Sequence, residues 1–400
     1  MVLSPFLINR MNKYLNEAQN LFSYTRDLRR DFHQHPEIGF QEYRTSGIVA
    51  RELTKLGLEV STGIAETGVV AVLEGETPGP TLLVRFDMDA LPIQEETGAS
   101  YASQTPGVMH ACGHDAHTAI GLTVARLLNQ HRDELAGRVK LVFQPAEEGL
   151  GGAERMVAEG VLQNPQPDMA LALHIWNTKP LGWVGITSGP VMAASERFSM
   201  EIRGSGGHAA SPHETRDPIL AAAHIITALQ SIVSRNVSPL DAAVLSITQV
   251  HAGDAFNVIP STARLDGTIR TFKSEVRTRV FARFHEISTQ IAQAMGCTIE
   301  LSPVGSITAV NNHPDITKRV FATAKQILPN SEIDTDYRTT GSEDMSYMMT
   351  DVPGCYFFVG SANEQLNAPH HHPRFDFDED VLPRAAGLMA QAVADLLTKQ

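Results

Sequence analysis

Short apolar segments that alternate with amphipathic stretches constrain the fold of this 400-residue chain more than any other feature. Short apolar runs bounded by glycine, proline or polar residues are typical of buried strands, whereas apolar side chains on one helical face indicate helices. Their alternation over residues 1–189 predicts a mostly parallel, doubly wound α/β sheet. The predicted strands are 68–73, 81–86, 139–143 and 169–173, and the predicted helices are 11–34, 42–56, 114–128 and 152–159.

The order of the predicted elements changes after Gly189. Strands at 196–203, 243–252, 262–271 and 297–303 and helices at 216–235 and 275–295 follow the order β-α-β-β-α-β of a ferredoxin-like unit. The first pattern then resumes, with helices at 313–328, near 343–349 and at 382–398, and a strand at 355–359. We therefore predict a larger α/β domain formed by 1–189 and 306–400, with a ferredoxin-like α+β lid or dimerisation domain inserted at 190–305.

Composition excludes several classes of function. A formal net charge of -13 argues against nucleic acid as a partner, because phosphate binding needs a basic surface. No uninterrupted apolar run is long enough to cross a bilayer, and no basic residue precedes the short apolar run near Pro5, so neither a membrane partner nor a signal peptide is expected. Three cysteines do not make a disulfide framework. We therefore expect a cytoplasmic protein.

Polar side chains repeatedly follow the predicted strands of the larger domain. In open α/β sheets, ligands bind beyond the carboxyl ends of the strands. Four strand ends here are followed by carboxylates or imidazoles, which predicts that these side chains meet at one edge of the sheet. They are Asp87 and Asp89 after Phe86, Glu147 and Glu148 after Phe143, His174 after Leu173, and the loop with His370, His371 and His372 after Val359.

Cys112 and His114 add a thiol and another imidazole to this set, in a polar turn that contains Gly113. Borderline-soft divalent metals prefer such mixtures of sulfur, nitrogen and oxygen ligands. The adjacent carboxylates Glu147 and Glu148 could divide two tasks, one holding metal and the other moving protons. Alone, each residue has a structural interpretation: Cys112 as a small buried side chain, for example. Together they predict a metal-dependent hydrolase.

With these residues in place, the chain resembles the aminoacylase and carboxypeptidase type of di-metal amidohydrolases. The most similar branch contains hippurate hydrolases, N-acyl-amino-acid amidohydrolases and plant indoleacetyl-amino-acid hydrolases. The resemblance extends over nearly the whole chain, and the ordered set of motifs is far more specific than any one of them. The motifs lie at 29–37, 87–93, 112–115, 144–149, 206–210, 257–260, 341–344 and 371–375.

The resemblance implies a role for particular residues. It implies that Glu147 is the general base and that Asp89 supports the site without binding metal directly. His208, on the inserted domain, would stabilise the oxyanion in the partner subunit's site. Asp87 stands where related branches have a histidine ligand, so its role stays open. The implied ligands of two divalent metals are Cys112, His114, Glu148, His174 and His371, the last chosen over His370 and His372 because it precedes Pro373 by two, and Asn257 and Arg270 are implied to meet the substrate carboxylate.

The expected reaction is cleavage of the amide bond of an N-acyl amino acid, giving a carboxylic acid and a free amino acid. Zinc, manganese, nickel and cobalt all suit the ligands, and a homodimer or larger homo-oligomer is expected through the inserted domain. A metallo-carboxypeptidase or dipeptidase on the same scaffold is the main alternative. A hydrolase with Cys112 as nucleophile and a non-catalytic metal-binding protein are the others.

Overall fold

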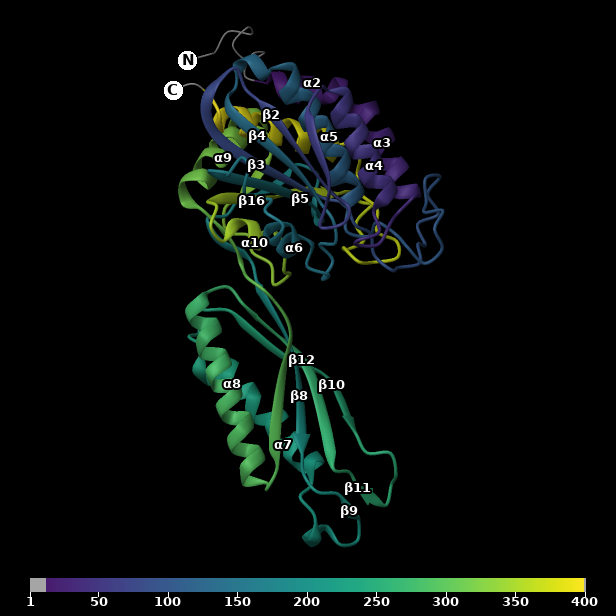
Figure 1. Cartoon of the computed structure of the whole chain (residues 1–400), viewed down its shortest axis with the longest axis vertical. Coiled ribbons are helices and arrows are strands. Elements are labelled where there is room, and N and C mark those ends of the chain that lie inside the picture. Colours follow the sequence, from purple (N-terminus) through teal and green to yellow (C-terminus); the bar gives the residue numbers. More distant parts are fainter. Residues whose placement is uncertain (1–11, 399–400) are drawn as a thin grey trace. The chain divides into compact units, whose positions relative to one another are not determined.

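The computed structural model describes residues 12–398, and the chain divides into two compact units (Figure 1). The large unit contains the chain up to Gly189, the segment Asn311–Tyr337 and the residues from Asp344 onward. The inserted unit contains Pro190–Val310 and the short segment Arg338–Glu343. The insertion predicted at 190–305 thus ends somewhat later in the structure, and the segment 338–343 joins it from a distant part of the sequence.

An eight-stranded sheet forms the centre of the large unit. Its four central strands, β4, β3, β5 and β16, run parallel, in agreement with the predicted doubly wound sheet. Antiparallel pairs occur only towards the edges, at β1–β2, β2–β4 and β16–β6. In sheet order the strands are β1 (Glu59–Ile64), β2 (Gly68–Glu74), β4 (Ala136–Gln144), β3 (Thr77–Asp87), β5 (Met169–Pro180), β16 (Gly354–Ala362), β6 (Trp183–Gly185) and β15 (Glu332–Asp334).

Two groups of helices cover this sheet: α11 packs with α2, α3, α5 and α9, whereas α6 packs with α10 (Figure 1). The helix predicted at 11–34 is two helices that meet at Leu21, and its predicted first residue lies outside the described part of the chain. Helices α5 and α11 are buried along most of their length, so α5 can hold side chains rigidly beneath the sheet edge. The helices are α2 (Lys13–Asn20), α3 (Phe22–Gln34), α4 (Tyr43–Lys55), α5 (His114–Gln130), α6 (Gly152–Ala158), α9 (Pro314–Ile327), α10 (Met345–Met349) and α11 (Val381–Leu396).

The inserted unit has the predicted ferredoxin-like architecture. Its four-stranded antiparallel sheet has the order β10-β12-β8-β13, and α7 and α8 lie on one face of it (Figure 1). Two short strands, β9 (Gly207–His208) and β11 (Val258–Ile259), pair beyond the end of this sheet. The main elements are β8 (Ala194–Arg203), α7 (Pro218–Ser231), β10 (Ala243–Ala252), β12 (Thr262–Thr271), α8 (Ser274–Ala294) and β13 (Thr298–Ile307). Strand β7 (Gly189–Met192) pairs with β14 (Val310–Asn312).

Helix α7 is more apolar than the sequence prediction allowed. Together with the π-helical segment after it, the stretch Pro218–Asn236 is long and apolar enough to cross a membrane by length and composition, and 33% of it is buried. The prediction considered uninterrupted apolar runs, and polar residues such as His224 interrupt this one. Ile225 and Leu229 pack into the core of the inserted unit, whereas Ile219 and Leu220 on the same helix are exposed.

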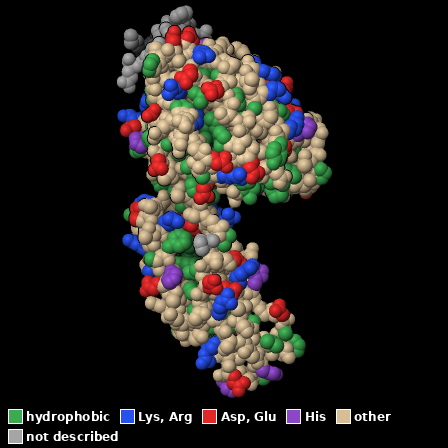
Figure 2. Space-filling view, viewed as in Figure 1, with side chains coloured by type: hydrophobic (Ala, Val, Ile, Leu, Met, Phe, Trp, Pro, Cys, Tyr) green, Lys and Arg blue, Asp and Glu red, His purple; other side chains and the backbone are tan. Residues whose placement is uncertain are grey.

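Charged side chains of both signs are mixed on the surface. On the face shown in Figure 2, Lys and Arg side chains alternate with Asp and Glu side chains and do not form a continuous basic area.

Candidate metal centre and active site

The ends of the central strands bring the predicted polar residues together. Asp87 is the last residue of β3, Asp89 follows it, and Glu147 and Glu148 lie just beyond β4. His174 departs from the prediction in one respect. It lies inside β5, which continues to Pro180, and it pairs in register with Phe358 of β16. The strand was expected to end at Leu173 because a polar side chain followed there, but backbone pairing with β16 extends it.

A tight turn places Cys112 beside His174. Helix α5 begins at His114, and Gly113 precedes it with a φ of 90°. A Cβ atom at Gly113 would lie 2.6 Å from a methyl group of Ile175, so the turn requires glycine for both its backbone conformation and its space. As a result, the Sγ atom of Cys112 lies 3.5 Å from Nε2 of His174.

All five predicted metal ligands converge around this thiol. In each of three groups, the potential ligand atoms lie within 4.8 Å of one another. Two of the groups share Cys112, so its thiolate could serve as a ligand in either group. The groups are Cys112, His114 and His174; Cys112, Glu148 and His371; and His114, Glu147 and Glu148.

Hydrogen bonds to the two buried histidines leave one ring nitrogen of each for a metal. Nδ1 of His174 donates to the carbonyl oxygen of Ile175 at 2.5 Å, so its Nε2 carries a lone pair towards Cys112. Nδ1 of His114 donates to Asp89, 3.1 Å from Oδ1, while its buried Nε2 has no hydrogen-bond partner among residues 12–398. Buried polar atoms rarely lack a partner, and metal-bound histidines commonly donate their other N–H to a carboxylate or carbonyl. The residues present therefore fit a divalent metal.

The histidine loop after β16 presents His371 to the site. Its Nε2 lies 3.3 Å from Oε1 of Glu148. His370 has Nε2 accepting from the backbone N–H of Asn177 at 3.2 Å, and Nδ1 of His372 accepts from the N–H of Arg374. Nδ1 of His370 lies 3.9 Å from Sγ of Cys112. Of the three histidines, His371 is the one whose ring nitrogen groups with Cys112 and Glu148 within 4.8 Å among residues 12–398.

Asp89 and Asp87 both use their carboxylate oxygens on neighbouring protein groups. Asp89 accepts from His114 and from the N–H of Glu148, the latter at 2.9 Å, so it orients two ligands at once. Asp87 accepts from Nδ1 of His117 and from the Arg85 guanidinium, both at 2.6 Å. Asp87 also forms a group with His114 and His117 whose potential ligand atoms lie within 4.8 Å of one another.

The electrostatics of the site favour a bound cation. Burial lowers the pKa of His114, but Asp87, Asp89 and Glu148 outweigh it and raise this pKa to about 10. Burial, together with carboxylates led by Glu148, raises the pKa of the Cys112 thiol well above its usual value. So much negative charge in a buried place suits a divalent cation. A nucleophilic thiol needs a lowered pKa instead, so these surroundings disfavour the cysteine-nucleophile alternative.

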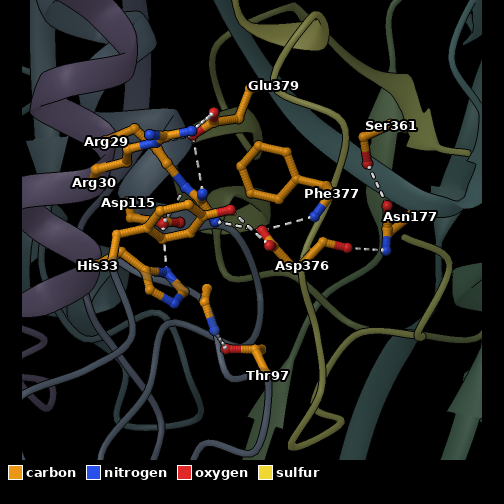
Figure 3. A network of polar contacts seen from close by, with 12 residues as sticks. Arg29, Arg30, His33, Thr97, Asp115, Asn177, Ser361, Asp376, Phe377 and Glu379 are labelled. Carbon is orange, nitrogen blue, oxygen red and sulfur yellow. Dashed lines mark hydrogen bonds and ion pairs between the residues drawn. The ribbon is translucent and has the colours of Figure 1, made fainter. Parts of the chain in front are cut away.

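A buried network around Arg29 was not identified from the sequence (Figure 3). Arg29, on α3, has a fully buried side chain that donates to Asp115 at 2.8 Å, to Asp376 at 3.0 Å and to Glu379 at 3.1 Å. His33, four residues further along α3, also contacts Asp115 at 2.8 Å. The helical spacing of Arg29 and His33 put them on one face, but their partners were not evident from spacing alone.

This network connects two parts of the site. Asp115 directly follows His114 on α5, and Asp376 lies on the segment that follows His371. By holding both carboxylates, Arg29 fixes the start of α5 relative to the histidine loop.

Replacing Arg29 with Met is expected to lower the free energy of unfolding by about 3–5 kcal/mol, because Asp115 would keep a buried charge without its cation. Denaturant unfolding measures this change. Arg26→Met is the matched control on the same helix. Its pair with Asp27 is partly exposed, so its loss is expected to cost less than about 1 kcal/mol. Equal losses for the two variants would show that the buried network does not stabilise the fold.

The inserted unit carries the remaining predicted site residues, at two separate places. His208 and Asn257 lie together, since β9 pairs with β11 and the N–H of Ala209 donates to the carbonyl oxygen of Asn257 at 3.0 Å. Arg270 lies near the other end of β12, where its guanidinium donates to Oγ of Ser342 at 2.9 Å. Thr262 and Arg270 are eight residue steps apart on β12, which is about 27 Å along the strand. Asn257 precedes the start of this strand, whereas Arg270 lies near its end.

Comparisons with known proteins agree with this geometry. A model of peptidase family M20/M25/M40 matches residues 83–395. The chain is 39% identical over 370 residues to the N-acetyl-L-cysteine deacetylase of Bacillus subtilis (strain 168), covering 92% of this chain and 87% of that protein. It is 38% identical over 383 residues to thermostable carboxypeptidase 1 of Saccharolobus solfataricus, covering 94% and 96%.

A solved structure shows the same fold at similar identity. The Bacillus subtilis YXEP protein, described as a dinuclear metal binding peptidase from the M20 family, superposes with a TM-score of 0.83 at 34% identity, covering 95% of this chain and 99% of that one. With its clustered sulfur, nitrogen and oxygen ligands, the chain belongs to peptidase family M20/M25/M40 and is a metal-dependent hydrolase of amide bonds.

Proposed function

We propose that this enzyme hydrolyses N-acyl amino acids to a carboxylic acid and a free amino acid, with two divalent metal ions at its centre. The observation that carries the proposal is the meeting of five potential metal ligands with a second carboxylate, Glu147, next to Glu148. The deacetylase relative supports an acyl group on the amino acid's nitrogen. The dinuclear structural relative supports two ions. The five ligands are Cys112, His114, Glu148, His174 and His371.

The site's own residues would carry the proton through the reaction. Divalent ions held there would lower the pKa of a water molecule towards neutrality and polarise the amide carbonyl. Glu147 would take a proton from the attacking water and return it to the amine nitrogen as the C–N bond breaks. Water is consumed, the acyl carbon gains its oxygen, and the amino acid leaves as a neutral amine. Asp89 would hold His114 and Glu148 in place throughout.

We also propose that the active enzyme is a dimer in which His208 and Asn257 serve the partner's site. The length of β12, about 27 Å from Thr262 to Arg270, supports this proposal, because Asn257 precedes the start of the strand and Arg270 lies near its end. Strand β10 supports it too, since it is an edge strand of the inserted sheet. Unpaired edges and exposed apolar side chains are common at interfaces. Val250, Phe256 and Val258 are such side chains in this unit.

A carboxypeptidase activity is the second candidate, supported by the relative that carries that name. Both reactions break an amide bond next to an amino acid with a free carboxylate, so the site chemistry is the same. A panel of N-acetyl, N-benzoyl and N-indoleacetyl amino acids, tested beside dipeptides of the same amino acids, separates the two. We expect higher kcat/KM for the N-acyl substrates; a preference for dipeptides would favour the carboxypeptidase.

Removal of metal is expected to abolish turnover, and added metal is expected to restore it. Dialysis against a chelator, followed by zinc, manganese, cobalt or nickel in turn, also ranks the metals. Metal content is measured beside amine release for each preparation. Full turnover by protein whose metal content is zero would contradict the proposal.

We further propose that the protein is cytoplasmic, where reducing conditions would keep the Cys112 thiol available as a metal ligand.

A further inference from the structure

Glu42 is a buried carboxylate that does not serve its own helix. It occupies the N-cap position of α4, where an acidic side chain usually accepts hydrogen bonds from the first turn. Its side chain makes no such bond. Glu37 performs that task instead, because its two oxygens accept from the N–H groups of Arg44 and Thr45, each at 2.9 Å. Glu42, with 0% exposure, is therefore free to act elsewhere.

The carboxylate of Glu42 points to the turn that carries the proposed base. Oε1 accepts from the backbone N–H of Ala146 at 2.9 Å, and Oε2 accepts from the hydroxyl of Thr67 at 2.5 Å. Ala146 directly precedes Glu147, and its φ of 55° lies in the left-handed region that is unfavourable for a residue with a Cβ. Its carbonyl oxygen accepts from the N–H of Gly152 at 3.0 Å. Both peptide groups of the strained residue are thus held.

Close packing surrounds the same turn. A Cβ atom on Gly39 would lie 2.9 Å from the Cα of Ala146, and one on Gly152 would lie 1.7 Å from the carbonyl oxygen of Pro145. The turn is therefore enclosed between the segment before α4 and the start of α6. Enclosure restricts where the turn can move, but the Ala146 N–H still needs a partner, which Glu42 supplies.

Keeping a carboxylate at this place is unfavourable in itself. Burial raises the pKa of Glu42 to about 7, with a further contribution from Asp89, although bonds from Thr67 and Ala146 oppose the rise. An apolar side chain would avoid this cost but would leave the Ala146 N–H without an acceptor. The contacts of Glu42 with the turn give a reason for a buried acid here.

We propose that Glu42 is a positioning residue, which holds Ala146 in its left-handed conformation and so directs Glu147 and Glu148 into the site. The role of Glu147 as base rests on the proposed function, whereas the position of Glu148 can be tested through metal affinity alone. Without its acceptor, the Ala146 peptide would relax to an ordinary conformation, and both glutamates would turn away from the metal ligands. A displacement of about 1 Å can cost roughly 100-fold in rate.

The test compares three substitutions of Glu42 with a matched control. Glu42→Ala is expected to lower kcat about 100-fold with a smaller change in KM, and to weaken metal binding about 10-fold. Glu42→Gln keeps an acceptor for the Ala146 N–H and is expected to restore both values to within about threefold of wild type. Glu42→Asp, whose carboxylate is withdrawn by one methylene, is expected to fall between them and replaces the alanine variant if that one fails to fold.

Glu37→Ala is the control, because it removes only the cap of α4. It is expected to lower the unfolding midpoint while leaving kcat and the metal Kd unchanged. Metal Kd is measured by competition with a chelating dye, which needs no substrate. Folded Glu42→Ala with wild-type kcat and metal Kd would overturn the proposal. So would a Glu42→Gln variant as impaired as Glu42→Ala, or a Glu37→Ala variant with the same losses.

The same experiment separates this proposal from the proposed function. If wild-type enzyme at full metal occupancy hydrolysed no N-acyl amino acid, the proposed function would fail, yet the metal Kd values would still decide whether Glu42 directs Glu148. If the substrate were turned over normally and the Glu42 variants behaved like wild type, only the positioning role would fail.

Discussion

Glu147→Gln is expected to lower kcat by about 10²- to 10⁴-fold while the enzyme keeps its metal, because the amide can no longer accept the proton of the attacking water. Glu148→Gln is expected to differ, since this change removes a carboxylate from the group with Cys112 and His371 and should weaken metal binding. Metal analysis beside steady-state kinetics distinguishes the two variants. Glu147 and Glu148 are adjacent in sequence. Only Glu148 belongs to the group of potential metal ligands that contains Cys112 and His371.

Two controls make this comparison decisive. Both variants exchange a carboxylate for an amide of the same size, so packing is closely matched. Kinetics of Glu148→Gln at high added metal show whether its loss is one of occupancy, in which case turnover rises with metal concentration. Near-normal turnover of Glu147→Gln at full occupancy would show that another group is the base.

His208→Ala is expected to lower kcat by about 10²- to 10³-fold through loss of one donor to the developing oxyanion. Mixing it with Glu147→Gln under conditions that allow subunit exchange is expected to restore activity. In a mixed dimer, one site combines Glu147 of the first subunit with the partner's intact histidine. Random exchange at equal amounts makes half the dimers mixed, so about a quarter of wild-type activity is expected.

The control for this experiment mixes His208→Ala with wild-type subunits that are labelled, so that exchange is observed directly. If mixed dimers form and no activity returns, His208 acts within its own subunit or has no catalytic role. His208 is exposed on β9, so its replacement by alanine is not expected to unfold the protein. A loss of activity in this variant would therefore reflect the missing imidazole.

Much of the fold and of the ligand set could be predicted because the signals are local. Strand β10 and strand β12 were placed at their observed bounds from apolar patterning. The rule that ligands gather at strand ends led to the glutamate pair after β4 and to the histidine loop after β16, whereas the choice of Glu148 and His371 came from the family resemblance. The rule also led to His174, although β5 continues past this residue. A parallel neighbour, β16, decides where that strand ends, and no pattern within β5 contains this information.

The contacts that hold the site could not be predicted from local patterns. Arg29 and Glu42 each act on residues far away in sequence, Asp115 and Ala146. The sequence does not show whether an arginine or glutamate is buried or exposed. Helical spacing indicates which residues share a face of the helix, but it does not indicate which distant residues that face contacts. The left-handed backbone of Ala146 is equally invisible, since alanine ordinarily avoids it.

The position of β16 sets the order in which a growing chain could acquire activity. This strand lies between β5 and β6 in the large sheet, yet it follows both of them in the sequence by more than 160 residues. Most of the inserted unit is synthesised before it and has its own core. The small domain can therefore fold during translation, whereas the large sheet keeps a gap at its centre until β16 arrives, followed by His371. A chain shortened before β16 would lose His371, a proposed metal ligand, together with the strand between β5 and β6, so we expect hydrolytic activity only after both have been synthesised.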